Sequence, residues 1–212
     1  KLNRPQVANS SVVWPTISPD GKWVIYLGDE DADQEQEMYR VPIAGGIATQ
    51  ISELPDFGVY ESFAISPDSQ RIVYTADREV DQRIELYSMS IMGGAVAKLS
   101  AMPAAGDIRS FAISPDGQSV VFEADRDTDD TYELYSVSIA GGTVTKLSSV
   151  QMVGDVYDFS ISPDSRRVIY LADKDVDNQF DLYSVPITGG ASIKLSALSA
   201  GGDLDISSLG IR

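Results

Sequence analysis

Two side chains that carry much of enzyme chemistry are missing from this sequence. Its 212 residues contain no cysteine and no histidine. Without cysteine the chain has no disulfide, no thiol nucleophile and no thiolate metal ligand. Without histidine it lacks the commonest general base and the commonest ligand of transition metals. We therefore expect that this chain is not an enzyme.

Long apolar runs and basic residues are also scarce. No run approaches the roughly 20 apolar residues of a membrane-spanning helix, so we expect no membrane insertion. Lys and Arg number 16 against 32 Asp and Glu, which gives an acidic chain with a formal net charge of −16. Four nine-residue windows hold 19 of the 32 acidic residues: 29–37, 77–85, 125–133 and 173–181. Charge concentrated in this way repels nucleic acid and attracts cations, so we expect no nucleic-acid partner.

The acidic windows belong to a strict internal repeat. The tetrad Ile-Ser-Pro-Asp begins at Ile17, Ile65, Ile113 and Ile161, in steps of 48 residues, and the Gly-Gly pairs keep the same step. A fixed period in this range indicates a repeat architecture.

Each repeat reads as four strands and three turns. A first strand ends at a Pro-Asp turn. The second carries an apolar run such as Val120–Phe122, which is typical of a strand covered on both faces. The third alternates, as at 133–139, and its Gly-Gly pair predicts a tight hairpin into the fourth. In that last strand stand Lys98, Lys146 and Lys194, which we interpret as charges protecting a sheet edge.

Four-stranded antiparallel sheets at this period predict the blades of a β-propeller. The expected fold is all-β, a β-propeller array of four four-stranded antiparallel blades in a single propeller segment. We place the blades at approximately 11–52, 60–100, 108–148 and 156–196, with a partial further strand at 197–212.

The two ends of such an array each expose an apolar blade face, and the sequence shows no evident polar cap. Four blades are the tight limit for closing a ring, whereas two four-bladed chains give a ring of common size. We therefore expect a homodimer in which two chains join head to tail and complete an eight-bladed ring.

The repeated motif also resembles a known family. An aromatic residue, Ile-Ser-Pro-Asp-Gly/Ser, an aliphatic–aliphatic–aromatic strand, Glu-Leu-Tyr-Ser-Val and Gly-Gly are together similar to the TolB-type, WD-like propeller repeat, over nearly the whole chain. The resemblance implies a non-catalytic binding or interaction scaffold in a periplasmic or secreted location, with an unknown protein or small-molecule ligand. It leaves one alternative open: the accessory propeller of a serine peptidase-like hydrolase whose catalytic domain lies outside this chain.

The acidic windows carry a candidate metal motif, with acids at positions 1, 3, 5 and 9. Carboxylates at positions 1, 3 and 5 of a loop can turn inward around a hard cation, and position 9 begins the returning strand. The spacing resembles the calcium hairpin loops of integrin-type propellers, which implies calcium on one rim. The candidate ligands are Asp29, Asp31, Asp33, Glu37, Asp77, Glu79, Asp81, Glu85, Asp125, Asp127, Asp129, Glu133, Asp173, Asp175, Asp177 and Asp181.

Position 6 of these loops departs from the calcium motif, in which glycine is usual. The chain has Gln34, Gln82, Asp130 and Asn178 there. Asp and Asn tolerate a left-handed backbone and Gln does so poorly, so repeats three and four are the better candidates. The alternative is that all four windows are solvated acidic hairpins, inherited by duplication.

The predicted first strands differ among the repeats at positions that would line a central channel: Val13 and Trp14, Glu61 and Ser62, Arg109 and Ser110, Tyr157 and Asp158. Variation there beside near-identity elsewhere fits a channel adapted to a ligand, and equally fits unselected positions. The Ser-Pro-Asp motif has no histidine partner and a complete explanation as a turn, so it does not predict catalysis.

Overall fold

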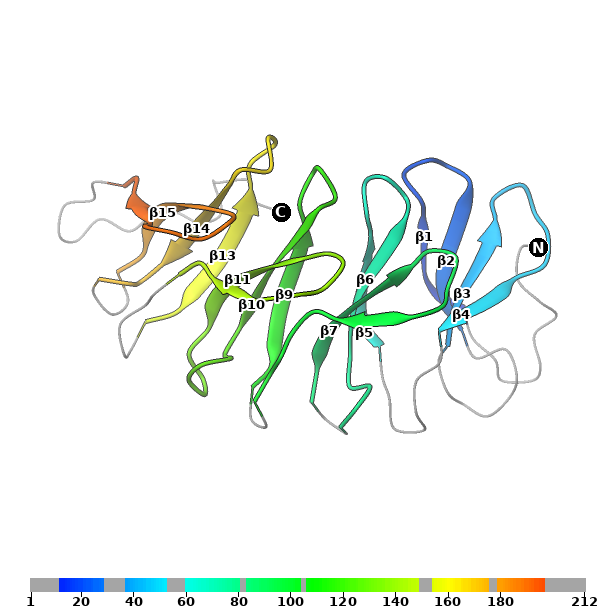
Figure 1. Cartoon of the computed structure of the whole chain (residues 1–212), viewed down its shortest axis with the longest axis horizontal. Helices are drawn as coiled ribbons and strands as arrows, with labels where there is room; N and C mark the ends of the chain where they lie inside the picture. Colours follow the sequence, from blue (N-terminus) through cyan, green and yellow to red (C-terminus); the bar gives the residue numbers. More distant parts are fainter. Residues whose placement is uncertain are drawn as a thin grey trace. The chain divides into compact units, whose positions relative to one another are not determined.

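The computed structural model describes residues 12–28, 37–52, 60–80, 83–103, 106–148, 154–175 and 179–196. Within them the chain forms only strands and turns, and the strands make four antiparallel sheets of four consecutive strands each (Figure 1). The predicted fold class is therefore confirmed. None of these residues forms a helix that is long and apolar enough to cross a membrane.

Each sheet is one blade. The strands of the first blade are β1 (Val12–Ile17), β2 (Trp23–Gly28), β3 (Glu37–Pro42) and β4 (Thr49–Ser52); those of the second are β5 (Tyr60–Ile65), β6 (Arg71–Ala76), β7 (Glu85–Ser90) and β8 (Val96–Lys98); those of the third are β9 (Ile108–Ile113), β10 (Ser119–Ala124), β11 (Glu133–Ser138) and β12 (Thr145–Lys146); and those of the fourth are β13 (Val156–Ile161), β14 (Arg167–Ala172), β15 (Asp181–Pro186) and β16 (Ile193–Lys194). The expected further strand at 197–212 lies outside the described residues.

The chain divides into two compact units, Lys1–Lys98 and Leu99–Arg212. The first unit contains the first and second blades, and the second unit contains the third and fourth. Equivalent positions in the two units are 96 residues apart, which is two repeats.

An aromatic pair crosses the middle of every blade. Tyr26 lies opposite Tyr39 in the β2–β3 register, and their rings stack with centroids 5.4 Å apart. The equivalent pairs stack at 5.6, 5.5 and 5.3 Å: Tyr74–Tyr87, Phe122–Tyr135 and Tyr170–Tyr183. Offset aromatic pairs of this kind contribute about 0.5–1.5 kcal/mol beyond the area they bury. The aromatic residue that ends each apolar run is thus explained by packing.

The Ser-Pro-Asp motif builds the first turn of each blade. In the third blade the Ser114 hydroxyl donates to Asp116 Oδ1 at 2.6 Å, and the same oxygen accepts the Gln118 N–H at 3.0 Å. Ser114 Oγ also accepts the N–H of Ser119 at 2.9 Å. The hydrogen bond from Ser114 is the main reason that the pKa of Asp116 lies below its usual value. The other three blades repeat these contacts.

In the second and fourth blades, the residue after this turn is a serine that hydrogen-bonds to the preceding blade of the same unit. The first and third blades have glycine there with φ of 70°, whereas the second and fourth have Ser69 and Ser165 with φ of 59° and 60°. Each serine hydroxyl accepts a backbone N–H from the preceding blade at 2.9 Å, Ser69 from Asp20 and Ser165 from Asp116. A left-handed backbone is unfavourable for serine, so this inter-blade hydrogen bond compensates for local strain.

Apolar side chains fill the space between the blades of each unit. In the second unit the third blade contributes Val121, Leu134 and Leu147, which pack against residues of the fourth blade that include Val168 and Tyr170. The first unit repeats the arrangement with Ile25, Met38 and Ile51 against Ile72, Tyr74 and Met89. Strands that are buried on both faces are the expected result of stacked blades.

Candidate functional site

The fourth-strand lysine of three blades pairs with two acids of its own hairpin. Lys98 Nζ lies 2.8 Å from Glu79 Oε2 and 2.7 Å from Glu85 Oε1. Lys194 Nζ lies 3.3 Å from Asp175 and 2.5 Å from Asp181. In the third blade Lys146 pairs with Asp127 at 3.0 Å and also with Glu133. These acids hold positions 3 and 9 of the predicted calcium motif, so an ammonium group lies where two of the metal ligands were expected.

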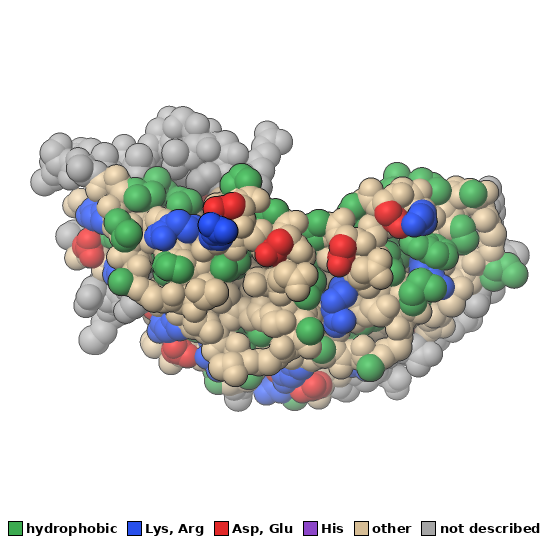
Figure 2. Space-filling view, turned by 45° about the horizontal axis from the view of Figure 1, so that its top comes forward, with side chains coloured by type: hydrophobic (Ala, Val, Ile, Leu, Met, Phe, Trp, Pro, Cys, Tyr) green, Lys and Arg blue, Asp and Glu red, His purple; other side chains and the backbone are tan. Residues whose placement is uncertain are grey.

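The two acids beside Lys146 favour the charged form of its side chain. Burial disfavours its charged form, but hydrogen bonds to Glu133 and Asp127 outweigh burial and raise its pKa. Lys and Arg side chains are accordingly interspersed with Asp and Glu over the surface seen in Figure 2. The lysines that we interpreted as edge protection therefore neutralise the hairpins. The first blade has Gln50 at this position, and its Glu37 accepts a hydrogen bond from the Tyr39 hydroxyl at 3.0 Å.

The remaining acids of the third hairpin come together. Carboxylate oxygens of Asp125, Asp129 and Asp130 all lie within 4.8 Å of one another. Asp130, at position 6, has φ of 59°, the left-handed conformation for which glycine is usual there. Asp125 is buried, and its Oδ1 accepts the N–H of Asp107 at 2.5 Å. Positions 1 and 5 of the motif thus meet in this hairpin, together with position 6, which the motif did not include.

Position 1 also has a structural role in the fourth blade. Asp173 Oδ1 accepts the N–H of Asp155 at 2.6 Å, as Asp125 does for Asp107, and so ties the hairpin to the start of the first strand. Five of the predicted ligands lie outside the described residues: Asp29, Asp31, Asp33, Asp81 and Asp177.

Every first strand carries a register irregularity near its beginning. Pairing skips Trp14 and Pro15 in β1, Glu61 in β5, Arg109 in β9 and Tyr157 in β13. A β-bulge inserts an unpaired residue and turns its side chain away from the regular alternation. Trp14 and Tyr157 are about half exposed, and Arg109 is exposed as well. The variable residues that we predicted to line a channel therefore include the bulged position of each first strand.

A buried glutamate supports the bulged arginine of the third blade. Glu123 Oε1 lies 2.7 Å from Arg109 Nη1, and its Oε2 accepts the Ser110 hydroxyl at 2.9 Å. Burial raises the pKa of Glu123 despite these partners. The Arg109 guanidinium also lies over the Tyr132 ring, 3.5 Å from its centroid. Glu123 was not among the predicted site residues, although a charge there contrasts with Leu27, Thr75 and Leu171 in the other repeats.

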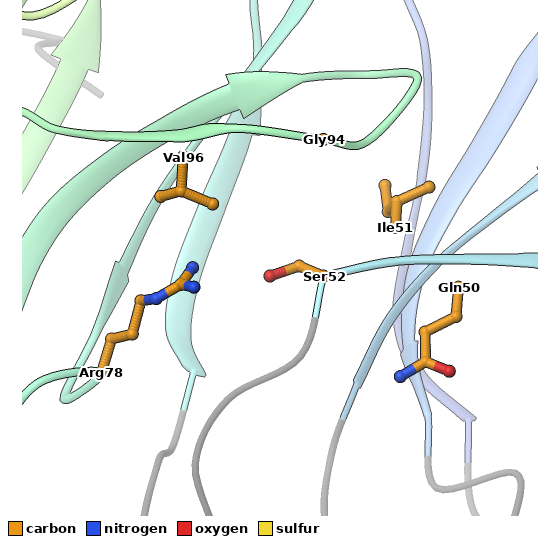
Figure 3. A pocket seen from close by; sticks show the side chains of 6 residues that line it. All are labelled: Gln50, Ile51, Ser52, Arg78, Gly94 and Val96. Carbon is orange, nitrogen blue, oxygen red and sulfur yellow. The ribbon is translucent and has the colours of Figure 1, made fainter.

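Each unit also has a cavity between its two blades. In the first unit it measures about 380 Å³ and is lined by Gln50, Ile51, Ser52, Arg78, Gly94 and Val96. The Arg78 guanidinium points toward Ser52 across this cavity (Figure 3), and its Nη1 donates to the Tyr74 hydroxyl at 3.3 Å. The described lining offers a cation, an amide and a hydroxyl but no carboxylate. It is suited to holding a polar group rather than to moving a proton.

The second unit has the equivalent cavity, about 480 Å³ in volume, lined by Lys146, Leu147, Ser148, Lys174, Gly190, Ala191 and Ser192. Lys174 takes the place of Arg78, and its Nζ lies 2.9 Å from Ser192 Oγ. The recurrence of this cavity shows that the stacking of blades itself creates it.

Comparison with known proteins agrees with the repeated blade and its turn. The family described as the TolB beta propeller domain matches residues 3–205. The chain belongs to this family. A comparison with curated proteins finds no match.

Two TolB structures have the same fold. The protein assigned as TolB from Agrobacterium tumefaciens is 22% identical, with a TM-score of 0.56 over 85% of this chain and 63% of its own. TolB from Acinetobacter baumannii is 18% identical, with a TM-score of 0.54 over 92% of this chain and 45% of its own. The chain thus spans about half to two thirds of the length of these TolB proteins.

Propellers of peptidases are also similar. A structure from a study of two prolyl endopeptidases is 10% identical, with a TM-score of 0.63 over 88% of this chain and 29% of that one. A puromycin-hydrolyzing peptidase of Mycobacterium tuberculosis is 15% identical, with a TM-score of 0.58 over 86% of this chain and 31% of its own. At these identities the likeness concerns the fold.

Proposed function

We propose that this chain is a non-catalytic binding scaffold whose bulged first-strand residues contact a protein partner. One observation carries the proposal. The bulge recurs in all four blades, yet the residue type at the bulged position differs: Trp14, Glu61, Arg109 and Tyr157. Trp, Arg and Tyr are the residue types most enriched at the energetic centres of protein interfaces. A constant backbone that presents varied side chains of this kind is suited to recognition.

The chemistry of the repeated motif supports the absence of catalysis. The hydroxyl of each Ser-Pro-Asp serine donates to the aspartate of the same turn, and its oxygen accepts a backbone N–H. A serine nucleophile needs a neighbouring base that removes its proton. An aspartate whose pKa is lowered by its own turn is a poor base, and the chain has no histidine.

Calcium at the acidic hairpins is part of the proposal, centred on the third blade. Three carboxylates gather there while Lys146 neutralises the other two acids of the hairpin. Carboxylate oxygens are the ligands that calcium prefers, and like charges at this distance repel one another unless a cation compensates. We also propose a periplasmic or secreted location, which a fusion of the full open reading frame to an export reporter would test.

An accessory role in a serine peptidase-like hydrolase is the second candidate. The similarity to peptidase propellers supports it, because this chain matches only 29% and 31% of those two chains. A hydrolase domain encoded in the same open reading frame would favour this role. A free-standing reading frame would favour the scaffold.

Selection of peptides from a random phage library tests the proposed binding surface. We expect selected peptides to bind the chain and to lose roughly tenfold or more in affinity on Trp14→Ala, Arg109→Ala or Tyr157→Ala, the size expected for interface centres. Val80→Ala, an exposed apolar residue of the second hairpin, is the control and should bind normally. Peptides that are insensitive to all three bulge substitutions would overturn the proposal.

A further inference from the structure

The cavity between the first and second blades lies apart from the bulged first strands. Its lining comes from β4, β8 and the turns before and after β7, and two strands of each sheet separate β4 and β8 from the first strands. Its volume of about 380 Å³ falls within the range of about 300–1,000 Å³ that small-molecule sites occupy. A ligand in this cavity is therefore separate from a partner bound at the first strands.

Arg78 is the one charged side chain of the described lining. Its Nη1 donates to the Tyr74 hydroxyl at 3.3 Å, and it forms no ion pair within the described residues. The equivalent residue of the third blade is already engaged, because Arg126 Nη1 lies 3.6 Å from Asp127 Oδ1 and its Nε donates to the carbonyl of Ala101 at 3.1 Å. A guanidinium has five N–H donors in a planar fork that matches the two oxygens of a carboxylate. Arg78 thus brings an available positive charge to the cavity.

The rest of the lining narrows the choice of anion. The Arg78 guanidinium points toward Ser52 (Figure 3), and Ile51 and Val96 contribute apolar surface. A single cation balances one negative charge but not two. Apolar side chains favour a ligand with an aliphatic part, since burying a strongly hydrated ion against them is costly. The described lining therefore fits an aliphatic carboxylate better than a phosphate.

The cavity of the second unit repeats this combination. Lys174 takes the place of Arg78, its Nζ lies 2.9 Å from Ser192 Oγ, and it forms no ion pair within the part of the chain that the structure describes. The other lining lysine, Lys146, is already neutralised by two acids of its own hairpin. Leu147 supplies apolar surface. One available cation beside a hydroxyl and an apolar side chain is thus common to both cavities.

We propose that the cavity between the two blades of each unit binds a small aliphatic carboxylate. Arg78 pairs with both carboxylate oxygens in the first unit, and Lys174 pairs with one in the second, so the first site is the tighter of the two. The aliphatic part lies against the apolar lining. Because the chain carries a net charge of −16, its surface at large repels anions, and binding depends on these two local cations. A free short-chain acid and a glutamate side chain carry the same chemical group.

Fluorine NMR with trifluoropropanoate as the probe tests the proposal on the purified chain. We expect the probe signal to broaden and the effect to saturate, whereas the neutral trifluoropropanamide should show no saturable change. Arg78→Gln should weaken the tighter site roughly tenfold, the size of one lost charge-assisted hydrogen bond, and Arg78→Lys should weaken it less. Arg78→Gln with Lys174→Gln should abolish the saturable effect.

Arg126→Gln is the matched control, because it removes the same charge from the equivalent position of the third blade. It should bind the probe as the unmodified chain does. Propanoate should displace the probe, and phosphate at the same concentration should not. A short peptide with a central glutamate, compared with its glutamine counterpart, distinguishes the two sources of the carboxylate: displacement at a lower concentration than propanoate indicates an acidic peptide segment, and weaker displacement indicates a free acid.

Three outcomes would overturn the proposal. Saturable broadening that persists in the double variant would show that these two cations do not hold the probe. Equal broadening of the neutral amide would show that the carboxylate is not recognised, and displacement by phosphate as effective as by propanoate would exclude selectivity for an aliphatic carboxylate. All three are independent of the first-strand surface, which the selected peptides test.

Discussion

The third and fourth blades share one unit and one framework, yet they differ at a few places. Both have the same turn, the same stacked aromatic pair and the same lysine between hairpin acids. The third blade has a buried glutamate, Glu123, and the fourth has Leu171 at the equivalent position. Its bulge presents Arg109, and the fourth presents Tyr157 with its ring against Phe180. The contrast teaches that the framework is constant and that the bulge and its support carry the differences.

The largest expected effect comes from removing the arginine that pairs with Glu123. Arg109→Ala leaves a buried carboxylate with only the Ser110 hydroxyl, and we expect a loss of about 2–3 kcal/mol in the free energy of unfolding. Adding Glu123→Leu, the residue type of the fourth blade, should restore stability to within about 1 kcal/mol of the unmodified chain. Urea denaturation of the single and double variants measures both. A double variant no more stable than Arg109→Ala would contradict this explanation of the buried glutamate.

Calcium should stabilise the chain through the acidic hairpin of the third blade and not through that of the fourth, by less than the change expected for Arg109→Ala. An ion bound to the folded state raises stability by mass action, and for a weak site in millimolar calcium we expect about 1–2 kcal/mol. Thermal unfolding with calcium and with a chelator measures this. Asp129→Asn with Asp130→Asn should abolish the shift, whereas Asp177→Asn in the fourth repeat should preserve it. Identical melting curves with calcium and with chelator would refute calcium binding.

The turn serine offers a test of the link between the two blades. Ser165→Ala removes the hydroxyl that accepts the Asp116 N–H and keeps a side chain at φ of 60°, so we expect a loss of about 1 kcal/mol. Ser165→Gly, which copies the third blade, loses the same hydrogen bond but relieves the left-handed backbone, and should cost less. If the two variants have the same stability, backbone strain at this position is not significant.

The smallest effect concerns pH. Because burial raises the folded-state pKa of Glu123 above its unfolded value, the folded state holds this proton more tightly. The contribution of Glu123 to stability is then fully present below about pH 4.5 and is lost as pH rises through the raised pKa. Relative to Glu123→Gln, the unmodified chain should therefore become less stable as pH rises over this interval. Denaturation midpoints that run parallel for the two proteins would show that Glu123 is not perturbed.

Much of the fold followed from the sequence because the repeat leaves little choice. A period of 48 residues with a doubly apolar second strand predicts stacked four-stranded blades, and the turn chemistry of Ser-Pro-Asp was read correctly from its residue types. The pairing of Lys146 with Asp127 and Glu133 was missed. Lys146 is 13 positions from Glu133 and 19 from Asp127, and only the register of the fourth strand against the hairpin brings it to them.

The bulged positions of the proposed binding surface were predicted only in part, for a different physical reason. Sequence variation marked Arg109 and Tyr157, but a β-bulge adds one residue without a characteristic composition, so their unpaired place in the strand could not be predicted. Glu123 did leave a signal, a charge at a position that is apolar or neutral in the other repeats.

The absence of cysteine makes one measurement especially direct. Tyr157→Cys gives the chain a single thiol for an environment-sensitive fluorophore, and Val80→Cys gives the matched control on the second hairpin. Because Tyr157→Cys removes one of the proposed contacts, we expect the fluorescence at position 157 to change and to saturate at a roughly tenfold higher concentration of a peptide selected against the unmodified chain, while the signal at position 80 stays constant. A saturating change at position 80 with none at position 157 would contradict binding through the bulged first strands.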